Sequence, residues 1–431
     1  MSAGESRQSR RVRPWREVEV YRRHVFFLSA SRLISITGSI AAYVALVAVL
    51  YDRSNHSGTW VAAGLVVSFG VSAVLGPWAG HLGDRYDRRH VMIAAELTAA
   101  AAFVGIAFAH SLVLLIVLAG VATAAESPFG PAAQALLVTL VPEEQRTWAT
   151  ATRSSSASAG MFIGGAIGGF IVAAFGGATA FLINAASFAI SAAFVSAIKG
   201  RYRTVRPEGV ADRGTSEGFR LVFSTPALWL TLVATSVGLL GTGMINVAEY
   251  PLFVDMGGGS QAYGIAVAGW ALGAFIAGRT MRRHGDAYTE RSRLLFGCGL
   301  VAVAIGLCGL VPLVGAVVVL FSIGGFAAQT RGIAATLIYQ RSTPDHIRAR
   351  AFAALGTANM SAIGVAMIVS GAIMGTLTPA GVCIACGFVG LLALLIAIRV
   401  PPRRRDPGDA GTATAEAAPS GRRDGWSLAT N

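Results

Sequence analysis

Long apolar stretches recur along this chain, and their length limits the fold more than any other feature. Each covers about 20 residues, enough for an α-helix to cross a hydrocarbon layer of about 30 Å. Because lipid offers the backbone no hydrogen-bonding partner, membrane spans are helices or closed barrel strands, and stretches without period-two alternation exclude the barrel. Charged residues make up 13% of the chain, against about 25% in soluble domains. We therefore expect an all-α polytopic membrane protein.

Twelve such stretches predict twelve transmembrane helices in two pseudo-symmetric six-helix bundles. They lie at about residues 25–50, 59–82, 91–110, 111–140, 149–174, 178–199, 227–254, 261–281, 294–312, 313–340, 350–375 and 378–399. The two halves share a motif, because "LVPEEQRTWA" at 140–149 aligns with "STPDHIRARA" at 342–351. Internal repeats of this kind are typical of secondary transporters.

Basic residues are distributed unevenly about these spans. Of the 35 Lys and Arg, Arg53 falls in a loop on one side, Arg32 and Arg331 fall within spans, and nearly all others lie on the opposite side. By the positive-inside rule that side is cytoplasmic, with both termini in the cytoplasm. The Arg-rich start directly precedes the first span, so we interpret it as a topogenic flank rather than a nucleic-acid site. We expect a multi-pass protein of the cell inner (plasma) membrane.

Polar segments predict the domain boundaries. The stretch 200–220 is polar and too long for a turn between two helices, and the chain after Val400 consists largely of Pro, Ala, Gly and charged residues. Such a composition buries too little apolar surface to fold. We expect a basic N-terminal tail at 1–23, bundles at 24–199 and 227–400, a cytoplasmic linker at 200–226, and a disordered cytoplasmic tail at 401–431.

The sequence also limits the source of energy and the chemistry. Its single lysine, Lys199, is not part of a GxxxxGK loop, which excludes an ATP-driven pump in this chain alone. Cys383 and Cys386 form a CxxC pair, but they lie inside an apolar stretch without a nearby His, so we expect neither a metal, a cofactor nor a disulfide. An ion-coupled transporter, a facilitator, a channel and a membrane enzyme remain.

The stretch "GHLGDRYDRR" at 80–89 lies between the second and third spans. It resembles the G-x-L-a-D-r-x-G-r-r signature of the major facilitator superfamily, except that Asp87 stands at the usual glycine. The resemblance implies two six-helix bundles and a conformational latch that stabilises the outward-facing state, in which Asp84 pairs with a cytoplasmic arginine such as Arg146 or Arg348. The latch candidates are Gly80, Asp84, Arg85, Arg88 and Arg89.

The fifth span carries "GMFIGGAIGGF", whose glycines recur every four residues and predict a close helix–helix contact. The packing glycines are Gly160, Gly164, Gly168 and Gly169. The string is similar to the antiporter motif of drug-exporting branches of the superfamily, with Gly165 in place of its proline. Together with "LVPEEQRTWATATRSSSASAG" and "FLINAASFAIS", it resembles the macrolide-efflux and enterobactin-exporter-like branch.

Four charged residues fall at membrane depth, where an unpaired charge is costly and such groups are functional-site candidates. They are Arg32, Glu126, Glu249 and Arg331. Because these fall on helices that line the cavity in this family, we expect Glu126 or Glu249 to carry a proton, and Arg32 or Arg331 to act as its charge partner. Snorkelling by Arg32 and an outer-mouth position for Glu249 remain alternatives. Glu96 is interpreted as a structural residue, and Tyr43 as a substrate contact.

These features predict a secondary active transporter that exports an amphipathic drug or natural product in exchange for protons. A siderophore exporter of the same fold is the alternative cargo class, and a channel or membrane enzyme is the alternative of another class. An enzyme is not expected, because the sequence shows no paired nucleophile and base near a membrane face. We expect a small-molecule substrate, protons and the lipid bilayer as partners, no nucleic acid, and a monomer.

Overall fold

The computed structural model describes residues 15–198, 200, 216–283, 289–344 and 347–402. Within these ranges, the regular elements are all helical. The first half contains α1 (Trp15–Arg53), α2 (Gly58–Arg85), α3 (Arg88–Ala107), α4 (Leu112–Glu126), α5 (Phe129–Leu140), a short 3-10 helix (Glu143–Gln145), α6 (Arg146–Phe175) and α7 (Gly177–Ser196). The second half contains α8 (Ser216–Ser224), α9 (Pro226–Asp255), α10 (Gly259–Arg283), α11 (Glu290–Cys308), α12 (Val314–Ser342), α13 (Arg348–Ile373) and α14 (Pro379–Ile398).

Eleven segments of the described chain are long and apolar enough to cross a membrane, with α4 and α5 together making one of them. A shorter apolar segment, Gly58–Ser72, lies in α2, where the second span is predicted. The all-helical membrane fold is thus confirmed for the described residues, while twelve as the number of spans stays a prediction. The linker predicted at 200–226 includes α8, which packs on α13 and α9 through Val222.

The predicted fourth span is broken in the middle. Its two parts, α4 and α5, meet at Ser127 and Pro128. Pro128 and Pro131 carry no N–H, so they cannot donate to the carbonyls four residues earlier, and the helix is interrupted. Ser127 and Pro128 keep right-handed helical dihedrals, so the break is a local loss of backbone hydrogen bonds rather than a loop. Glu126 is the last residue of α4, directly before this break.

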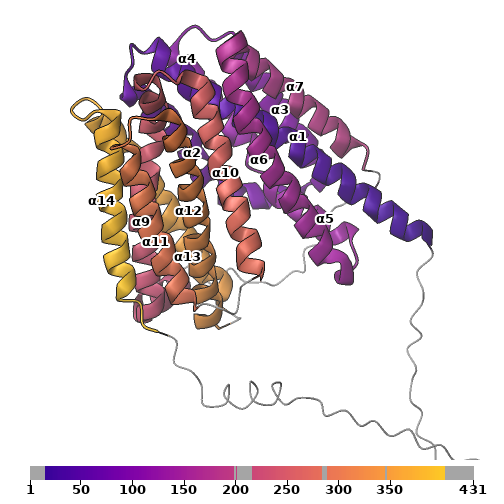
Figure 1. Ribbon diagram of the computed structural model, residues 1–431. Helices are drawn as coiled ribbons and strands as arrows, with labels where there is room; N and C mark the ends of the chain where they lie inside the picture. The colour runs from indigo at the N-terminus through magenta and orange to yellow at the C-terminus, as the bar shows by residue number, and fades with distance from the viewer. Residues whose placement is uncertain (1–14, 199, 201–215, 284–288, 345–346, 403–431) are drawn as a thin grey trace, which may run out of the picture.

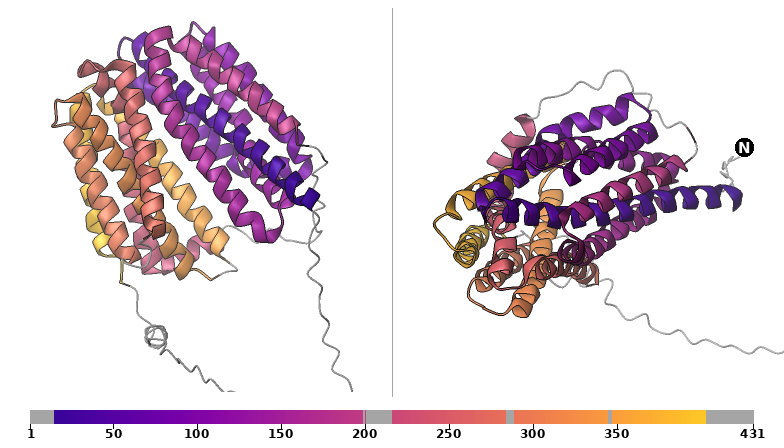
Figure 2. Two further views of the ribbon diagram at one scale, coloured as in Figure 1. Left: turned by 45° about the vertical axis from the view of Figure 1, so that its right-hand side comes forward. Right: turned by 90° about the horizontal axis from the view of Figure 1, so that it is seen from above.

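The helices form two groups that pack mainly within themselves (Figure 1). In the first group, α1 packs on α6 and α7, and α3 packs on α4 and α7; in the second, α12 packs on α10 and α11, and α14 packs on α9 and α11. The principal contacts between the groups are α6 with α10 and α2 with α13. The groups meet at one end and diverge toward the other (Figure 2).

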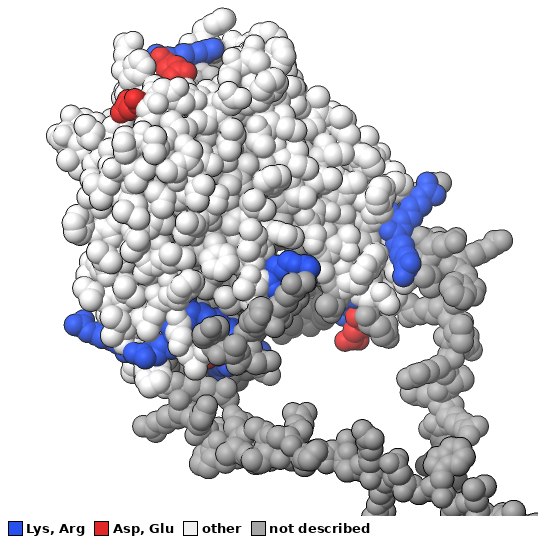
Figure 3. All heavy atoms as spheres, in the orientation of Figure 1, with Lys and Arg blue, Asp and Glu red and all other residues white. Residues whose placement is uncertain are grey.

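The two ends of the molecule differ in charge. Lys and Arg gather at the end where the groups diverge, which we call the basic end (Figure 3). Both described chain ends, the start of α1 and the residues after α14, lie there as well (Figure 2). The opposite end, where the groups meet, carries Asp52 and Arg53 at the end of α1 and Asp255 at the end of α9. Charged side chains are sparse between the two ends in this view (Figure 3), and many large hydrophobic side chains are exposed, as in a protein that faces lipid.

Helix α6 of the first group packs on α10 of the second group and presents glycines on two of its faces. A Cβ atom on Gly160 would lie 2.8 Å from the Leu33 carbonyl oxygen of α1, so this face packs directly on α1. On the other face, a Cβ on Gly165 would lie 2.7 Å from the Ala268 nitrogen of α10. Glycine permits such backbone-to-backbone approach between helices. The packing predicted for Gly160 and Gly164 is therefore against α1, and Gly165 extends it to the second group.

Candidate functional site

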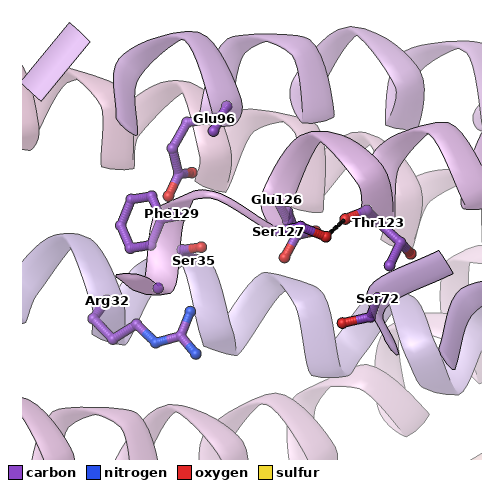
Figure 4. Close-up of a pocket in the computed structure, with 10 residues that line it drawn as sticks. Arg32, Ser35, Ser72, Glu96, Thr123, Glu126, Ser127 and Phe129 are labelled. Carbon is purple, nitrogen blue, oxygen red and sulfur yellow. Dashed lines mark hydrogen bonds between the residues drawn. The ribbon is translucent and has the colours of Figure 1, made fainter. Parts of the chain in front are cut away.

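A polar cavity of about 240 Å³ lies inside the first helix group, between α1, α2, α3, α4 and α5. Its lining includes Arg32 of α1, Glu96 of α3 and Glu126 of α4 (Figure 4). Hydroxyl groups of Ser35, Ser72, Thr123 and Ser127 complete the polar lining. The structure thus brings two carboxylates and one guanidinium, from three helices, to a single cavity.

Arg32 interacts electrostatically with both Glu126 and Glu96. In the described part of the chain, it forms no ion pair with either within 4 Å. Its side chain is only partly buried, whereas Glu96 is buried with Ser35 and Ser191 beside its carboxylate. The Oε2 atom of Glu96 nevertheless lacks a hydrogen-bond donor among the described residues. An open arrangement of this kind leaves room for protons or water between the charges.

Glu126 owes its position to the break between α4 and α5. The Ser127 hydroxyl donates to the Thr123 carbonyl at 2.9 Å, which stabilises the last turn of α4 beside the polar cavity (Figure 4). The Phe129 ring and Gly130 begin the next helix on the same side. The side chain of Glu126 therefore projects into the cavity at a point where the backbone itself is not fully hydrogen-bonded.

A second cavity of about 340 Å³ lies between the two helix groups, and we call it the central cavity. Glu249 of α9 lies in its wall and is 6% exposed. Tyr43 of α1 donates to Glu249 Oε1 at 3.3 Å, and Tyr263 of α10 donates to the same oxygen at 2.9 Å. Glu249 therefore connects helices of both groups through two phenols, rather than lying at the outer mouth.

Above the central cavity, at the end opposite the basic end, polar contacts join α1 to α9. The Tyr250 hydroxyl donates to Asp52 Oδ1 at 3.2 Å and lies 3.1 Å from Oδ2. The ring of Tyr250 packs edge-on against Tyr51 and Tyr263, with centroid distances of 5.7 and 5.5 Å. These contacts link the two helix groups at this end.

Arg331, the other predicted charge partner, is buried within the second helix group. Its guanidinium lies against Gly238 of α9, where a Cβ on the glycine would lie 3.1 Å from the Arg331 Cζ atom. Gly297 of α11 also packs against its backbone, since a Cβ on that glycine would lie 2.7 Å from the Arg331 nitrogen. Arg331 lines neither the polar cavity nor the central cavity, so the structure does not bring it to Glu126 or Glu249.

The latch candidates lie at the basic end, where α2 ends and α3 begins. Arg88 donates to the Ala135 carbonyl at 2.9 Å and to the Thr139 hydroxyl at 2.7 Å, and Arg89 donates to the Ser196 carbonyl. Both arginines thus tie α3 to neighbours in its own group. Arg85 is exposed.

Asp87 caps the N-terminus of α3 by accepting from the Arg89 amide at 3.0 Å, with a φ of −62°. The loop therefore needs no left-handed residue at this position. Gly80 and the side chain of Asp84 lie outside what the structure describes, so the Asp84 latch stays a prediction.

Comparison with known proteins identifies the family. The sequence profile of the Major Facilitator Superfamily matches residues 25–289 and 239–430. The chain belongs to this superfamily. The resemblance drawn from "GHLGDRYDRR" is confirmed, and the protein is a multi-pass membrane transporter of a family that carries small molecules.

Relatives of this superfamily member include exporters. It is 24% identical over 368 residues to the multidrug efflux pump Tap of Mycolicibacterium fortuitum, covering 78% of this chain and 86% of Tap. It is 26% identical over 401 residues to the enterobactin exporter EntS of Shigella boydii, covering 88% of this chain and 92% of EntS. The fold matches a bacterial homologue of the human lysosomal transporter Spinster in an inward-facing, unoccupied conformation, with a TM-score of 0.67, 16% identity, and 88% and 95% of the two chains covered.

Proposed function

We propose that this protein is a secondary active transporter that exports an amphipathic drug or natural product in exchange for protons, by alternating access. It acts as a monomer in the bacterial plasma membrane, with rigid bundles at 24–199 and 227–400. Similarity to Tap and EntS supports export. The observation that carries proton coupling is the polar cavity, in which Glu126, Glu96 and Arg32 face one another at membrane depth.

The proposed topology places the basic end in the cytoplasm. The gathering of Lys and Arg at that end supports it, because positive charge is retained on the cytoplasmic side. The helix groups meet at the other end, through Tyr250 and Asp52 and through α6 and α10, and they diverge toward the basic end. We therefore assign the described conformation to the inward-facing state.

Proton exchange would use Glu126 as the carrier. In the inward-facing state the carboxylate gives its proton to the cytoplasm, and Arg32 stabilises the resulting negative charge across the cavity. In the outward-facing state it takes up a proton from outside, which neutralises it and favours return. Glu96 also interacts with Arg32, so it competes with Glu126 for the positive charge and would weaken the stabilisation of ionised Glu126.

The test uses everted membrane vesicles with a respiration-driven pH gradient, read by a quenched acridine dye, to which macrolides, lipophilic cations and siderophores are added. We expect a transported compound to collapse the gradient in wild type and to have at most about a tenth of that effect in Glu126→Gln, because glutamine cannot take up or release the proton and a positioned proton-transfer group contributes about 10²–10⁴-fold to a rate. Glu143→Gln, an exposed glutamate outside the cavity, is the matched control. Equal responses of wild type and Glu126→Gln would contradict the role of Glu126.

Siderophore export is the second candidate. The similarity to EntS favours it, because that alignment covers 88% of this chain. A siderophore that collapses the gradient, while macrolides and lipophilic cations do not, would support this cargo class.

Tyr250→Phe is expected to open the outer end more often. The change removes a hydrogen bond to a carboxylate, worth about 1.5–3 kcal/mol when the acceptor is charged and less at a partly exposed site. Ile245, buried in the central cavity wall, is replaced by cysteine as a reporter and labelled by an impermeant maleimide from outside. Labelling should rise about threefold to tenfold in Tyr250→Phe. The four native cysteines are buried, and the chain without the reporter measures their background. An unchanged labelling rate would show that Tyr250 does not hold the outer end closed.

A further inference from the structure

We propose that the Glu249 carboxylate is the counter-ion for a lipophilic cation in the central cavity, so that the cargo of this exporter carries a positive charge. The inference rests on the proposed export function and adds the substrate class to it. Its basis is the chemistry of the cavity wall, which combines one carboxylate with aromatic rings from both helix groups.

The cavity has the size and lining of a small-molecule site. Its volume of about 340 Å³ falls in the range of about 300–1,000 Å³ that is common for ligand pockets. Aromatic rings come from four helices: Tyr43 of α1, Phe69 of α2, Trp270 of α10 and Phe321 of α12. Trp270 and Phe321 pack edge-on, with centroids 6.4 Å apart. Aromatic faces attract cations through the negative charge density of the ring.

Glu249 is arranged to present one oxygen to a ligand. Both phenols, from Tyr43 and Tyr263, donate to Oε1. In the described part of the chain, Oε2 accepts no hydrogen bond. The atom nevertheless stays accessible from the cavity. Since Glu249 lines the cavity, Oε2 is the atom left for a bound group. A cation placed there would favour the ionised carboxylate by its own charge.

The charges of the cavity wall favour one sign of ligand. Among the described residues that line it, Glu249 is the sole carboxylate, and none is Lys, Arg or His. A bound anion would meet the carboxylate without a basic partner, which costs free energy at a buried site. A cation would pair with it. The same argument disfavours an anionic siderophore as the cargo.

The polar cavity differs in this respect. It contains Arg32 together with Glu96 and Glu126, so its carboxylates already have a positive neighbour from the chain itself. Glu249 has none and lies at the interface between the helix groups. The two sites therefore separate the roles: protons at Glu126 within one group, and cargo at Glu249 between the groups.

Two ions of nearly identical shape and opposite charge test the proposal, tetraphenylphosphonium and tetraphenylborate. Each is measured in a separate sample by equilibrium dialysis against the purified chain in detergent, with protein-free micelles as the blank. We expect wild type to bind the phosphonium ion at least about tenfold more tightly than the borate ion. Glu249→Gln should weaken phosphonium binding by about tenfold or more. Asp255→Asn, which removes an exposed carboxylate from the same helix, should leave it unchanged.

Three results would overturn the proposal: no phosphonium binding to wild type, equal affinity for the two ions, or unaltered phosphonium binding in Glu249→Gln. The comparison of the two ions uses wild type alone, so it still tests the proposal if Glu249→Gln fails to fold. Phosphonium binding without any effect on the pH gradient would leave this site intact and contradict the proposed proton exchange. Proton exchange driven by an anionic compound alone would support the proposed proton exchange and contradict the cation site at Glu249.

Discussion

Replacing Gly264 with alanine is expected to slow transport by about fivefold to a hundredfold, because it forces α6 and α10 apart where the two helix groups meet. A Cβ atom at Gly264 would lie 2.6 Å from the Gly165 carbonyl oxygen and 2.6 Å from the Gly169 Cα atom. Both are backbone atoms, which cannot rotate away. Overpacking of this kind costs about 1–3 kcal/mol, and about 1.4 kcal/mol changes a population tenfold. The state with a closed outer end is therefore depleted.

Gly278→Ala on the same helix is the matched control. A Cβ atom at Gly278 would enter open space among the described residues, and alanine favours the helix. Transport is measured in the vesicle assay, and maleimide labelling of a cysteine at position 245 reports the opening of the outer end. We expect Gly264→Ala to be slow and strongly labelled, and Gly278→Ala to behave as wild type. If the two variants transport at the same rate, the α6–α10 contact does not control the cycle.

Arg32→Gln is expected to abolish proton-coupled export and to destabilise the fold. It leaves Glu96 and Glu126 in one cavity without their positive neighbour. Removing one partner of a buried charge set costs about 3–5 kcal/mol, and the partial exposure of Arg32 reduces this to about 1–3 kcal/mol. The double variant Arg32→Gln with Glu126→Gln should regain about 0.5–3 kcal/mol, because it also removes a carboxylate. Thermal unfolding in detergent measures both effects.

Arg153→Gln is the matched control for Arg32→Gln, because it also removes one positive charge from the first helix group. Arg153 of α6 interacts with Arg32 at longer range and donates to Gln134 Oε1 at 3.5 Å, but it does not line the polar cavity. We expect it to retain proton-coupled export. Strictly additive losses of stability in the Arg32 and Glu126 variants would show that the two charges do not interact.

The membrane helices could be predicted from the sequence because hydropathy and length depend on each residue alone. The break in the fourth span had a local signal as well, since Pro128 and Pro131 both lie in "ESPFGP" directly after Glu126. The capping role of Asp87 was not predicted. The family pattern has glycine at this position, so the sequence was compared with that glycine and not with the N-cap of the helix that begins at Arg88.

The site residues were less accessible to sequence reasoning, because pairing across helices depends on rotation about each helix axis. Glu96 was interpreted as structural, yet it lies in the same cavity as Arg32 and Glu126. Tyr263 was not considered, although its hydroxyl lies 2.9 Å from Glu249 Oε1. The signal for Glu96 was its charge at membrane depth; for an isolated tyrosine in an apolar helix the sequence has no comparable signal.

Arg331 is a residue that the sequence predicted for the site and that the structure places elsewhere. Its charge at membrane depth and its place on a cavity-lining helix made it a candidate partner for Glu126, but its guanidinium lies against Gly238 inside the second group. The sequence gives no means to tell which face of a mostly apolar helix turns toward the cavity, since both faces are hydrophobic.

The double glycine face of α6 affects how the two groups separate. Where Gly165 and Gly169 meet Gly264, the contact is backbone against backbone, and glycine has no side-chain rotamers to lose or regain. The surfaces can part without rearranging side chains, so this contact adds little friction to the movement. In the proposed cycle, the balance between open and closed states then depends on the two phenol–carboxylate bonds between the groups, Tyr43 with Glu249 and Tyr250 with Asp52, which respond to water and charge. We therefore expect Tyr43 and Tyr250, rather than the glycine contact of α6, to determine how long the outer end stays closed.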